Sequence, residues 1–376
     1  MRMAMVAGEA SGDLLASLLL AGLRRRWPAL QTAGIGGPRM AEQGFAAWWP
    51  HDKLAVRGYV EVLRHYREIA AIRNALAERL LRERPQAFIG VDAPDFNLGL
   101  ELRLKRAGIK TIHFVCPSIW AWRGGRARKM AASADHVLCL FPFEPELLRA
   151  HGVAATFVGH PLADAIPLQP PRAASRAALG LGADERVVAV LPGSRRSEIQ
   201  TIAPPFLQAV ALLHRQRPEL RFVLPVAAGL RDLLDPLVAQ HAPGAPLQLV
   251  DGQSHAVLAA CDITLIASGT ATLEAALFKR PMVIGYRMHG LSWQIMKRMK
   301  YQPWVGLPNI LCREFVVPEL LQDDCRADKL AAAVLASLDD AAGCQRVALR
   351  FQDLHLLLRR DTASCATDAI AQIVQA

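Results

Sequence analysis

The chain has 376 residues, enough for two domains of ordinary size, and 52% of them are hydrophobic. Its formal net charge of +10 favours an anionic partner, and the lack of a zinc-finger pattern or long basic tract makes nucleic acid the least favoured one. No apolar run reaches the roughly 18–20 residues that span a bilayer, and the seven cysteines form no CxxC pair, so we expect buried, reduced thiols and no zinc site.

Short apolar runs alternate with helical patterns through the first half of the chain. The expected strands are residues 3–7, 32–35, 87–91, 110–115, 136–141 and 155–158, and the expected helices include residues 14–26 and 59–82. Strands this short and apolar, alternating with helices, predict a doubly wound parallel sheet.

The same pattern restarts after a proline-rich stretch, residues 161–175, which we interpret as an interdomain linker. The expected strands are then residues 187–191, 222–226, 247–250, 263–267 and 282–286, and residues 327–376 are expected to be mostly helical. The fold class predicted is therefore α/β, with two Rossmann-like domains facing across a cleft. Their expected bounds are 1–165 and 166–350, with a helical segment, 351–376, that packs back on the N-terminal domain.

Two turns in the second half are suited to an anion. Ser268, Gly269 and Thr270 follow an expected strand and open a helix, so bare N–H groups and the helix dipole face whatever lies above them. Glu274, about one turn further, could accept hydrogen bonds from ribose hydroxyls. The alternative is an ordinary capped turn with Glu274 in solvent, and this segment alone favours neither.

A second such turn shifts the balance towards a nucleotide. Gly193, Ser194 and Arg195 follow the strand expected at residues 187–191. Glycine lets the backbone approach a ligand closely, and the guanidinium group suits a diphosphate. Two anion-ready turns in one half of the chain predict a nucleotide site there.

Two carboxylates follow an expected strand of the first half, at Asp92 and Asp95. Carboxylates at a cleft mouth suit general-base catalysis on a hydroxyl, and partial burial would raise one pKa into a useful range. The alternative is a helix cap at Asp92 and a solvated Asp95. The spacing is not a D-x-D metal motif, so no metal is expected.

Two other segments of the first half carry polar side chains. The turn at residues 8–13 presents Glu9, Ser11 and Asp13, and its acidity suits hydroxyls or amines better than phosphate. Trp122 and Arg123 lie in a segment that could hold a sugar against indole and a phosphate against arginine. The alternative there is a basic helix start with buried tryptophans. Residues 34–38 lack the third glycine of a dinucleotide fingerprint, which excludes that interpretation.

Taken together, these segments resemble the lipid-A-disaccharide synthases, glycosyltransferases of outer-membrane lipid synthesis. The resembling residues, in chain order, are 8–13, 34–40, 91–97, 117–123, 159–162, 191–198, 268–274 and 307–310. They span nearly the whole chain, and the aspartate loop with the Trp-Ala-Trp-Arg segment is specific as a set. Arg196 occupies a position that we expect to vary.

The resemblance implies the two-domain GT-B fold, no cofactor, and an inverting transfer from UDP-2,3-diacylglucosamine to 2,3-diacylglucosamine 1-phosphate. The products would be the β-1′,6-linked disaccharide 1-phosphate and UDP. In this scheme Asp95 is the preferred base, with Asp92 second. The implied donor-side residues are those of the two turns with Glu274 and Asn309, and the implied acceptor-side residues are Glu9, Ser11, Asp13, Trp122 and Arg123.

Both implied substrates are lipids, so we expect a cytoplasmic enzyme that docks on the inner membrane. The candidate contact is the apolar stripe of Tyr59, Val62, Leu63 and Tyr66, which is flanked by arginines. The alternative is a helix whose stripe faces the domain core. Two rival functions remain open: a UDP-sugar 2-epimerase of the same architecture, and a non-catalytic basic protein that binds membranes or nucleic acid.

Overall fold

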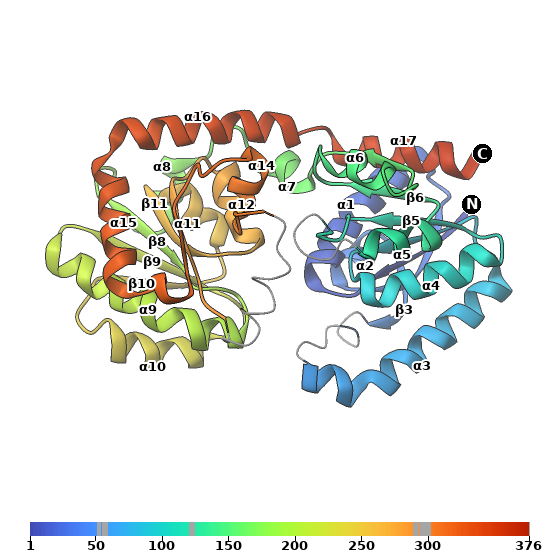
Figure 1. Ribbon diagram of the computed structural model, residues 1–376, viewed down its shortest axis with the longest axis horizontal. Coiled ribbons are helices and arrows are strands. Elements are labelled where there is room, and N and C mark those ends of the chain that lie inside the picture. The colour runs from blue at the N-terminus through green and yellow to red at the C-terminus, as the bar shows by residue number, and fades with distance from the viewer. Residues whose placement is uncertain (51–53, 55–58, 120–124, 289–292, 294–301, 376) are drawn as a thin grey trace. The chain divides into compact units, whose positions relative to one another are not determined.

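The structure is a computed structural model of the chain, and it describes residues 1–50, 54, 59–119, 125–288, 293 and 302–375, without the side chains of residues 10 and 59–66. The chain divides into two compact units (Figure 1). The first unit is Met1–Asp164 together with Leu358–Ala376, and the second is Ala165–Leu357.

Among its described residues, the first unit contains a seven-stranded sheet in the order β3-β2-β1-β4-β5-β6-β7, and all its strand pairs are parallel. The strands are β1 (Arg2–Ala7), β2 (Gln31–Gly36), β3 (Ala46–Pro50), β4 (Ala87–Val91), β5 (Lys110–Phe114), β6 (His136–Cys139) and β7 (Ala155–Phe157). The helices are α1 (Ala10–Arg26), α2 (Pro38–Glu42), α3 (Tyr59–Glu83), α4 (Pro94–Arg106), α5 (Gly125–Ser133), α6 (Glu144–Arg149) and α17 (Thr362–Gln375).

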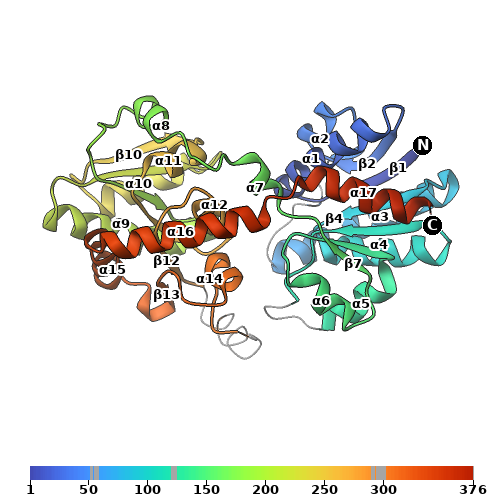
Figure 2. The same ribbon diagram turned by 90° about the horizontal axis from the view of Figure 1, so that it is seen from above.

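Helices cover both faces of this sheet, which explains why its strands read as continuous apolar runs. Leu20 of α1 and Ile370 of α17 pack with Ile89 of β4 on one side. Residues of α3 and α4 pack with Val6 and Phe88 in a separate cluster. The helix α17 lies beside α1, so the end of the chain completes the core of the first unit (Figure 2).

Asp164 holds this returning segment in place. Its carboxylate accepts hydrogen bonds from the backbone N–H groups of Arg360, Asp361 and Thr362, at 3.1, 3.0 and 2.7 Å. These groups precede or begin α17, so Asp164 caps the helix from a distant part of the chain. The segment expected at 351–376 is not one element, because α16 (Ala341–Leu358) continues in the second unit up to residue 357.

The described part of the second unit contains a six-stranded parallel sheet in the order β10-β9-β8-β11-β12-β13. Its strands are β8 (Val187–Leu191), β9 (Arg221–Val226), β10 (Leu247–Asp251), β11 (Ile263–Ala267), β12 (Met282–Tyr286) and β13 (Glu319–Leu321). Its helices are α8 (Arg172–Ala178), α9 (Arg196–Gln216), α10 (Arg231–His241), α11 (Ser254–Ala260), α12 (Thr270–Leu277), α14 (Leu307–Cys312), α15 (Ala327–Asp339) and α16. Side chains of α9 and α15 form one core with β8, β9, β11 and β12.

The proline-rich stretch at residues 161–175 is more ordered than a linker. It contains α7 (Pro161–Ala165), where the two units meet in the chain, and the start of α8. Arg176 of α8 is buried, and its guanidinium group pairs with the Asp262 carboxylate at 3.0 Å. The same carboxylate accepts the Val187 N–H at 2.8 Å, so α8 is fixed to the first strand of the second sheet.

Candidate active site

Each sheet reverses its strand order at one point, between β1 and β4 in the first unit and between β8 and β11 in the second. In doubly wound sheets, ligands bind beyond the carboxyl ends of the strands at such a point. The loop after β4 holds both candidate bases, and the loops after β8 and β11 hold the two anion-ready turns. The structure thus brings both candidate bases and both anion-ready turns to the switch points of their own sheets.

In the first unit, the loops after β1 and β4 touch. Ala7 and Val91 are register partners at the ends of these strands. A Cβ atom added to Gly8 would lie 3.2 Å from the Cβ atom of Ala93, so the two loops are packed side by side. Glycine at position 8 therefore allows the polar residues after β1 to lie close to the aspartate loop.

Asp92 is half-buried and has an unusual backbone conformation. Its φ is +50° and that of Ala93 is +44°, in the left-handed region that non-glycine residues seldom adopt. The Asp92 N–H donates to the Phe114 carbonyl at 2.9 Å, and the Asn97 side-chain amide donates to the Asp92 carbonyl at 2.8 Å. Hydrogen bonds on both sides of the residue hold the strained loop in place.

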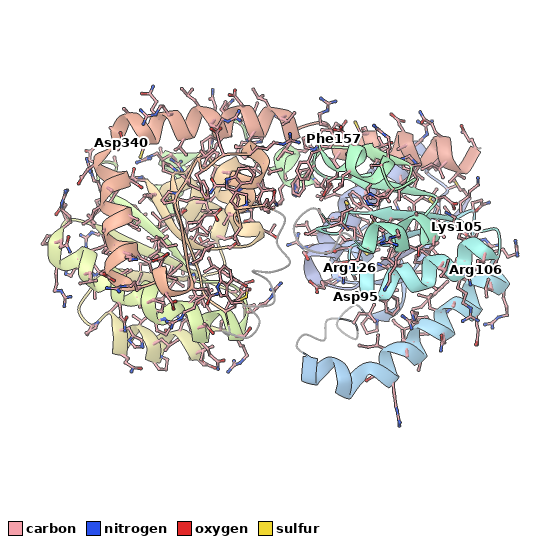
Figure 3. All side chains as sticks on the ribbon, viewed as in Figure 1. Asp95, Lys105, Arg106, Arg126, Phe157 and Asp340 are labelled. Atoms are coloured by element: carbon pink, nitrogen blue, oxygen red, sulfur yellow. The ribbon has the colours of Figure 1, made fainter. Side chains whose placement is uncertain are left out.

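Asp95 lies in the first turn of α4, and its environment differs from that of Asp92. Its side chain is 85% exposed and pairs with Arg126 of α5 at 2.6 Å (Figure 3). One carboxylate oxygen of Asp95 is thus already bound by a guanidinium group, and the side chain is in solvent. This environment is less suited to general-base catalysis than that of Asp92.

The expected turn at residues 8–13 is mostly helix, because α1 begins at Ala10 with Glu9 as its N-cap residue. Glu9 is half-buried and Ser11 is exposed in the first helical turn. Asp13 is buried instead, and its carboxylate accepts the N–H groups of three residues at the start of α2, namely Gly37, Arg39 and Met40. Because its carboxylate oxygens are already bound at the start of a second helix, Asp13 is not proposed as an acceptor contact. Trp122 and Arg123 lie outside the described residues.

The turn after β8 is closed by Glu198, the last residue of the resembling segment 191–198, to which the sequence analysis gave no role. The Glu198 carboxylate accepts the Ser194 N–H at 3.0 Å and pairs with the Arg195 guanidinium group at 3.1 Å. Gly193 has a φ of +124°, and a Cβ atom there would lie 2.6 Å from Glu198. An anion at this turn would replace or share the contacts that Glu198 makes.

The turn after β11 opens α12, which begins at Thr270. Gly269 is the N-cap residue, and Thr272 donates through its hydroxyl to the Gly269 carbonyl at 2.7 Å. Ser268 donates to the Val305 carbonyl at 3.3 Å. The first N–H groups of α12 have no partner within the helix, as at every helix start, so they and the dipole favour an anion.

Glu274 lies on the second turn of α12, and its side chain is 21% exposed. Its carboxylate is 3.2 Å from Nε2 of His255, which lies in the first turn of α11. This contact rules out the alternative in which Glu274 points into bulk solvent. The imidazole orients the carboxylate beside the anion-ready turn.

Asn309, expected on the donor side, is fully buried. Its amide nitrogen donates to the Val317 carbonyl at 2.9 Å and to the Glu319 carboxylate at 2.8 Å, and its amide oxygen accepts the Val317 N–H at 3.0 Å. The Glu319 carboxylate also accepts the N–H groups of Val305 and Gly306. Asn309 therefore orders the segment that Ser268 contacts, and a direct ligand contact is not supported.

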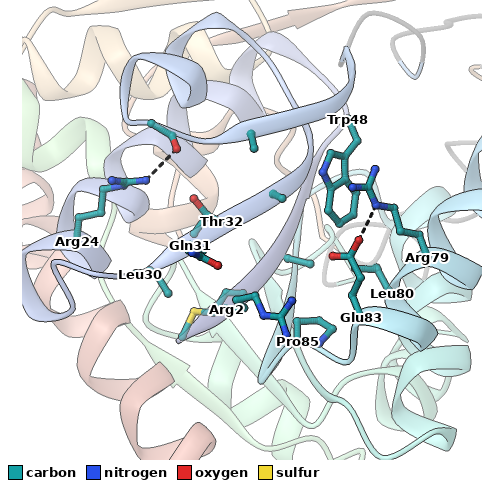
Figure 4. A pocket seen from close by; sticks show the side chains of 15 residues that line it. Arg2, Arg24, Leu30, Gln31, Thr32, Trp48, Arg79, Leu80, Glu83 and Pro85 are labelled. Atoms are coloured by element: carbon teal, nitrogen blue, oxygen red, sulfur yellow. Dashed lines mark hydrogen bonds and ion pairs between the residues drawn. The ribbon is translucent and has the colours of Figure 1, made fainter.

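A pocket of about 420 Å³ lies elsewhere in the first unit, at the amino ends of β1, β2 and β3 (Figure 4). The Arg79 guanidinium group lies there 3.6 Å from the centroid of the Trp48 ring and pairs with Glu83 at 2.8 Å. Because its lining comes from the opposite ends of the strands, this pocket is separate from the candidate site. Within the described ranges, no helix is both long and apolar enough to cross a bilayer, and no three His, Cys, Asp or Glu side chains form a group that could hold a metal ion.

The chain is similar to known proteins along its whole length. The family model described as lipid-A-disaccharide synthetase matches residues 3–374. The lipid-A-disaccharide synthases of Albidiferax ferrireducens and Verminephrobacter eiseniae are 60% and 58% identical to it, and the alignments cover 100% of this chain and 98% and 97% of the relatives.

Solved structures agree on the fold. A UDP-GlcNAc 2-epimerase from Neisseria meningitidis, bound to UDP-GlcNAc, has a TM-score of 0.66 at 11% identity and covers all of both chains. The MurG protein of Acinetobacter baumannii has a TM-score of 0.60 at 15% identity, over 99% of each chain. These matches show two-sheet α/β proteins of the GT-B class, as the sequence predicted. With the family match over residues 3–374, they lead to one conclusion: the chain belongs to the lipid-A-disaccharide synthase family.

Proposed function

We propose that this chain transfers the sugar of UDP-2,3-diacylglucosamine to the 6-hydroxyl of 2,3-diacylglucosamine 1-phosphate. The products are the β-1′,6-linked disaccharide 1-phosphate of lipid A biosynthesis, and UDP. Membership of the family over nearly the full length carries this proposal. The switch-point loops support it, because one unit offers carboxylates for a hydroxyl and the other offers N–H groups and arginine for a diphosphate.

In the proposed reaction the acceptor oxygen attacks the anomeric carbon as the bond from that carbon to the UDP oxygen breaks. The acceptor proton passes to a carboxylate, and the anomeric centre is inverted. We propose Asp92 as this base in place of Asp95, because Asp92 is half-buried while Asp95 is exposed and paired with Arg126. Partial burial disfavours the charged form and makes a carboxylate a stronger base.

The leaving UDP carries the developing negative charge. We propose that the start of α12, with Ser268, Gly269 and Thr270, and the turn that holds Gly193, Ser194 and Arg195 stabilise its diphosphate. Fixed dipoles and a guanidinium group act without reorganisation at the moment of reaction. Glu274 holds the ribose, and Glu9 and Ser11 are proposed acceptor contacts. Trp122 and Arg123 are also proposed there, on the sequence resemblance alone.

Release of UDP, measured with both lipid substrates, tests the activity. We expect UDP and the disaccharide to form in equal amounts, and only when both substrates are present. An epimerase would convert the donor without an acceptor, and a binding protein would release no UDP. Either result would contradict the proposal.

We further expect the reaction to continue in excess EDTA, because helix termini and arginine can carry the diphosphate charge. The measurement is the initial rate before and after chelation, with Mg²⁺ or Mn²⁺ added back. A rate that falls with EDTA and returns with either metal would show that a cation shares this role.

We propose that the enzyme is cytoplasmic and docks on the inner membrane through the start of α3, since both proposed substrates are lipids. Tyr59, Val62, Leu63 and Tyr66 would enter the headgroup boundary, and the neighbouring arginines would meet anionic lipid. Further along the same helix, Leu76 and Leu80 are buried in the core, so the two halves of α3 would differ in role.

Val62→Ser combined with Leu63→Ser tests this docking. We expect weaker co-sedimentation with vesicles that contain anionic lipid, at an almost unchanged melting temperature. The matched control is Leu76→Ser, which changes the same helix in the core and should lower the melting temperature instead. If the double variant is strongly destabilised and still binds vesicles normally, the stripe belongs to the core.

A further inference from the structure

A cluster of polar side chains is buried beneath the aspartate loop. Asn97 and Glu101 of α4 and His113 of β5 are each 0% exposed. The Nδ1 atom of His113 is 2.7 Å from the Glu101 carboxylate. Asn97 is the last residue of the resembling segment 91–97, whereas Glu101 and His113 belong to no motif of the sequence analysis. Asn97 and Glu101 lie on a helix that begins in the aspartate loop.

Gly90 of β4 makes room for this cluster. It is the register partner of His113 on the neighbouring strand. A Cβ atom at Gly90 would lie 2.2 Å from the Glu101 carboxylate oxygen and 3.0 Å from the Cβ atom of Asn97. The absence of a side chain at this one strand position therefore allows two polar side chains of α4 to reach the sheet.

The cluster is costly for stability. Within the described part of the chain, Oδ1 of Asn97, Oε2 of Glu101 and Nε2 of His113 are buried without a hydrogen-bond partner. Each such atom has given up its hydrogen bonds to water without gaining a partner, which lowers stability, and a buried ion pair seldom repays its own desolvation. Packing alone therefore gives no reason for polar groups here, whereas a site at the end of β4 does.

Two contacts connect the cluster to Asp92. The Asn97 amide donates to the Asp92 carbonyl and so restrains the left-handed peptide. The second contact is electrostatic. The pKa of His113 is raised above its ordinary value although burial lowers it, because the charge and hydrogen bond of Glu101 and the charge of Asp92 outweigh the burial.

Other elements around His113 bring few competing charges. Its register partner on β6 is Val137, which packs with Cys139 and with Ala127 and Met130 of α5 in an apolar cluster. On α5 the Arg126 guanidinium group is bound to Asp95. The electrostatic partners of His113 are thus Glu101 from α4 and Asp92 from the loop after β4.

We propose that Asn97, Glu101 and His113 are positioning residues for Asp92, where Asn97 fixes its backbone and the hydrogen-bonded Glu101–His113 pair lies within electrostatic reach of its carboxylate. This inference rests on the proposed function, in which Asp92 is the base. Below the pKa of His113, the positive neighbour keeps Asp92 in the ionised form that can accept a proton, and it offsets part of the gain in base strength that partial burial gives. The charge of Glu101 keeps the buried imidazole protonated.

The test is the pH dependence of kcat/KM for Glu101→Gln, which keeps the shape and removes the charge. The imidazole should then become neutral, so Asp92 should lose its positive neighbour. The low-pH limb of the kcat/KM profile, where activity falls as the base is protonated, should therefore move up by about one pH unit. Asn97→Ala should lower kcat without moving that limb, because it breaks only the backbone contact. If the low-pH limb of the kcat/KM profile stays in place in Glu101→Gln, the Glu101–His113 pair has only a structural role, whatever the melting temperature of the variant.

A second measurement follows the titration of the buried cluster directly. We expect the NMR titration of His113, assigned by its loss in His113→Gln, to show a pKa above the usual 6.5, which falls in Asp92→Asn when the neighbouring charge is gone. A neutral His113 throughout about pH 5–8, or a titration unchanged by Asp92→Asn, would overturn the inference. The outcomes separate the two proposals: if Asp92→Asn is fully active, the base assignment fails, and if Asp92→Asn is inactive with His113 unaffected, only the positioning role fails.

Discussion

Replacing Asp92 with Asn is expected to lower kcat by about 10²–10⁴-fold. The amide has the size and shape of the carboxylate but cannot accept the acceptor's proton. Asp92 is half-buried, and its backbone is held by hydrogen bonds to Phe114 and Asn97, so the substitution should leave the loop in place. The measurement is single-turnover kinetics with both lipid substrates, which separates the chemical step from product release.

Asp95→Asn is the matched control, since it makes the same chemical change three residues away. Asp95 is exposed and paired with Arg126, so its loss should cost far less than that of Asp92. The melting temperature and the affinity for UDP should be unchanged in both variants. If Asp95→Asn were inactive and Asp92→Asn nearly normal, the base would be Asp95, as the sequence alone suggested.

The strands at the centre of each sheet could be predicted from the sequence with accurate bounds. β4, β8, β11 and β12 begin and end where expected, because a parallel strand covered on both faces is an uninterrupted apolar run between polar turns. The edge strands β3 and β13 were missed. They are partly exposed and lack the cover on both faces that the central strands have, so their pairing with a neighbour defines them.

The turns of the candidate site could be predicted for a similar reason, since small and polar residues after an apolar run mark the end of a strand. The partners of those residues could not. Asp13 caps α2 from 24 or more positions away, and Glu274 meets His255 from a different helix. Such contacts depend on which loops the fold brings together, and a single sequence does not specify that.

The preference for Asp95 over Asp92 shows the same limit. Both carboxylates follow one buried strand, and their spacing does not indicate which one is shielded from solvent. Helix α4 begins between them, which sends Asp95 outward to Arg126 and leaves Asp92 at the strand end. The buried pair of Glu101 and His113 left one sequence signal, a histidine within an otherwise apolar strand, but a lone histidine there does not reveal its partner.

Glu274→Ala is expected to weaken UDP binding by about 1–3 kcal/mol, or about 5–150-fold in Kd. The Glu274 carboxylate is proposed to accept hydrogen bonds from both ribose hydroxyls, and alanine removes both acceptors at once. His255, 3.2 Å away, already fixes the orientation of this carboxylate, so little entropy is spent when the nucleotide binds. Isothermal titration calorimetry with UDP gives the affinity without any lipid substrate.

Two further variants make this result specific. Glu219→Ala removes a carboxylate of the same unit that is 58% exposed and weakly paired with Arg217, and it should leave the affinity for UDP unchanged. His255→Gln keeps a hydrogen-bonding side chain beside Glu274 and should cost much less than Glu274→Ala. If all three variants bound UDP like the wild type, Glu274 would have no part in the donor site, and its contact with His255 would serve only to join α11 to α12. If His255→Gln were as damaging as Glu274→Ala, the orientation of the carboxylate, and not its presence alone, would determine the affinity.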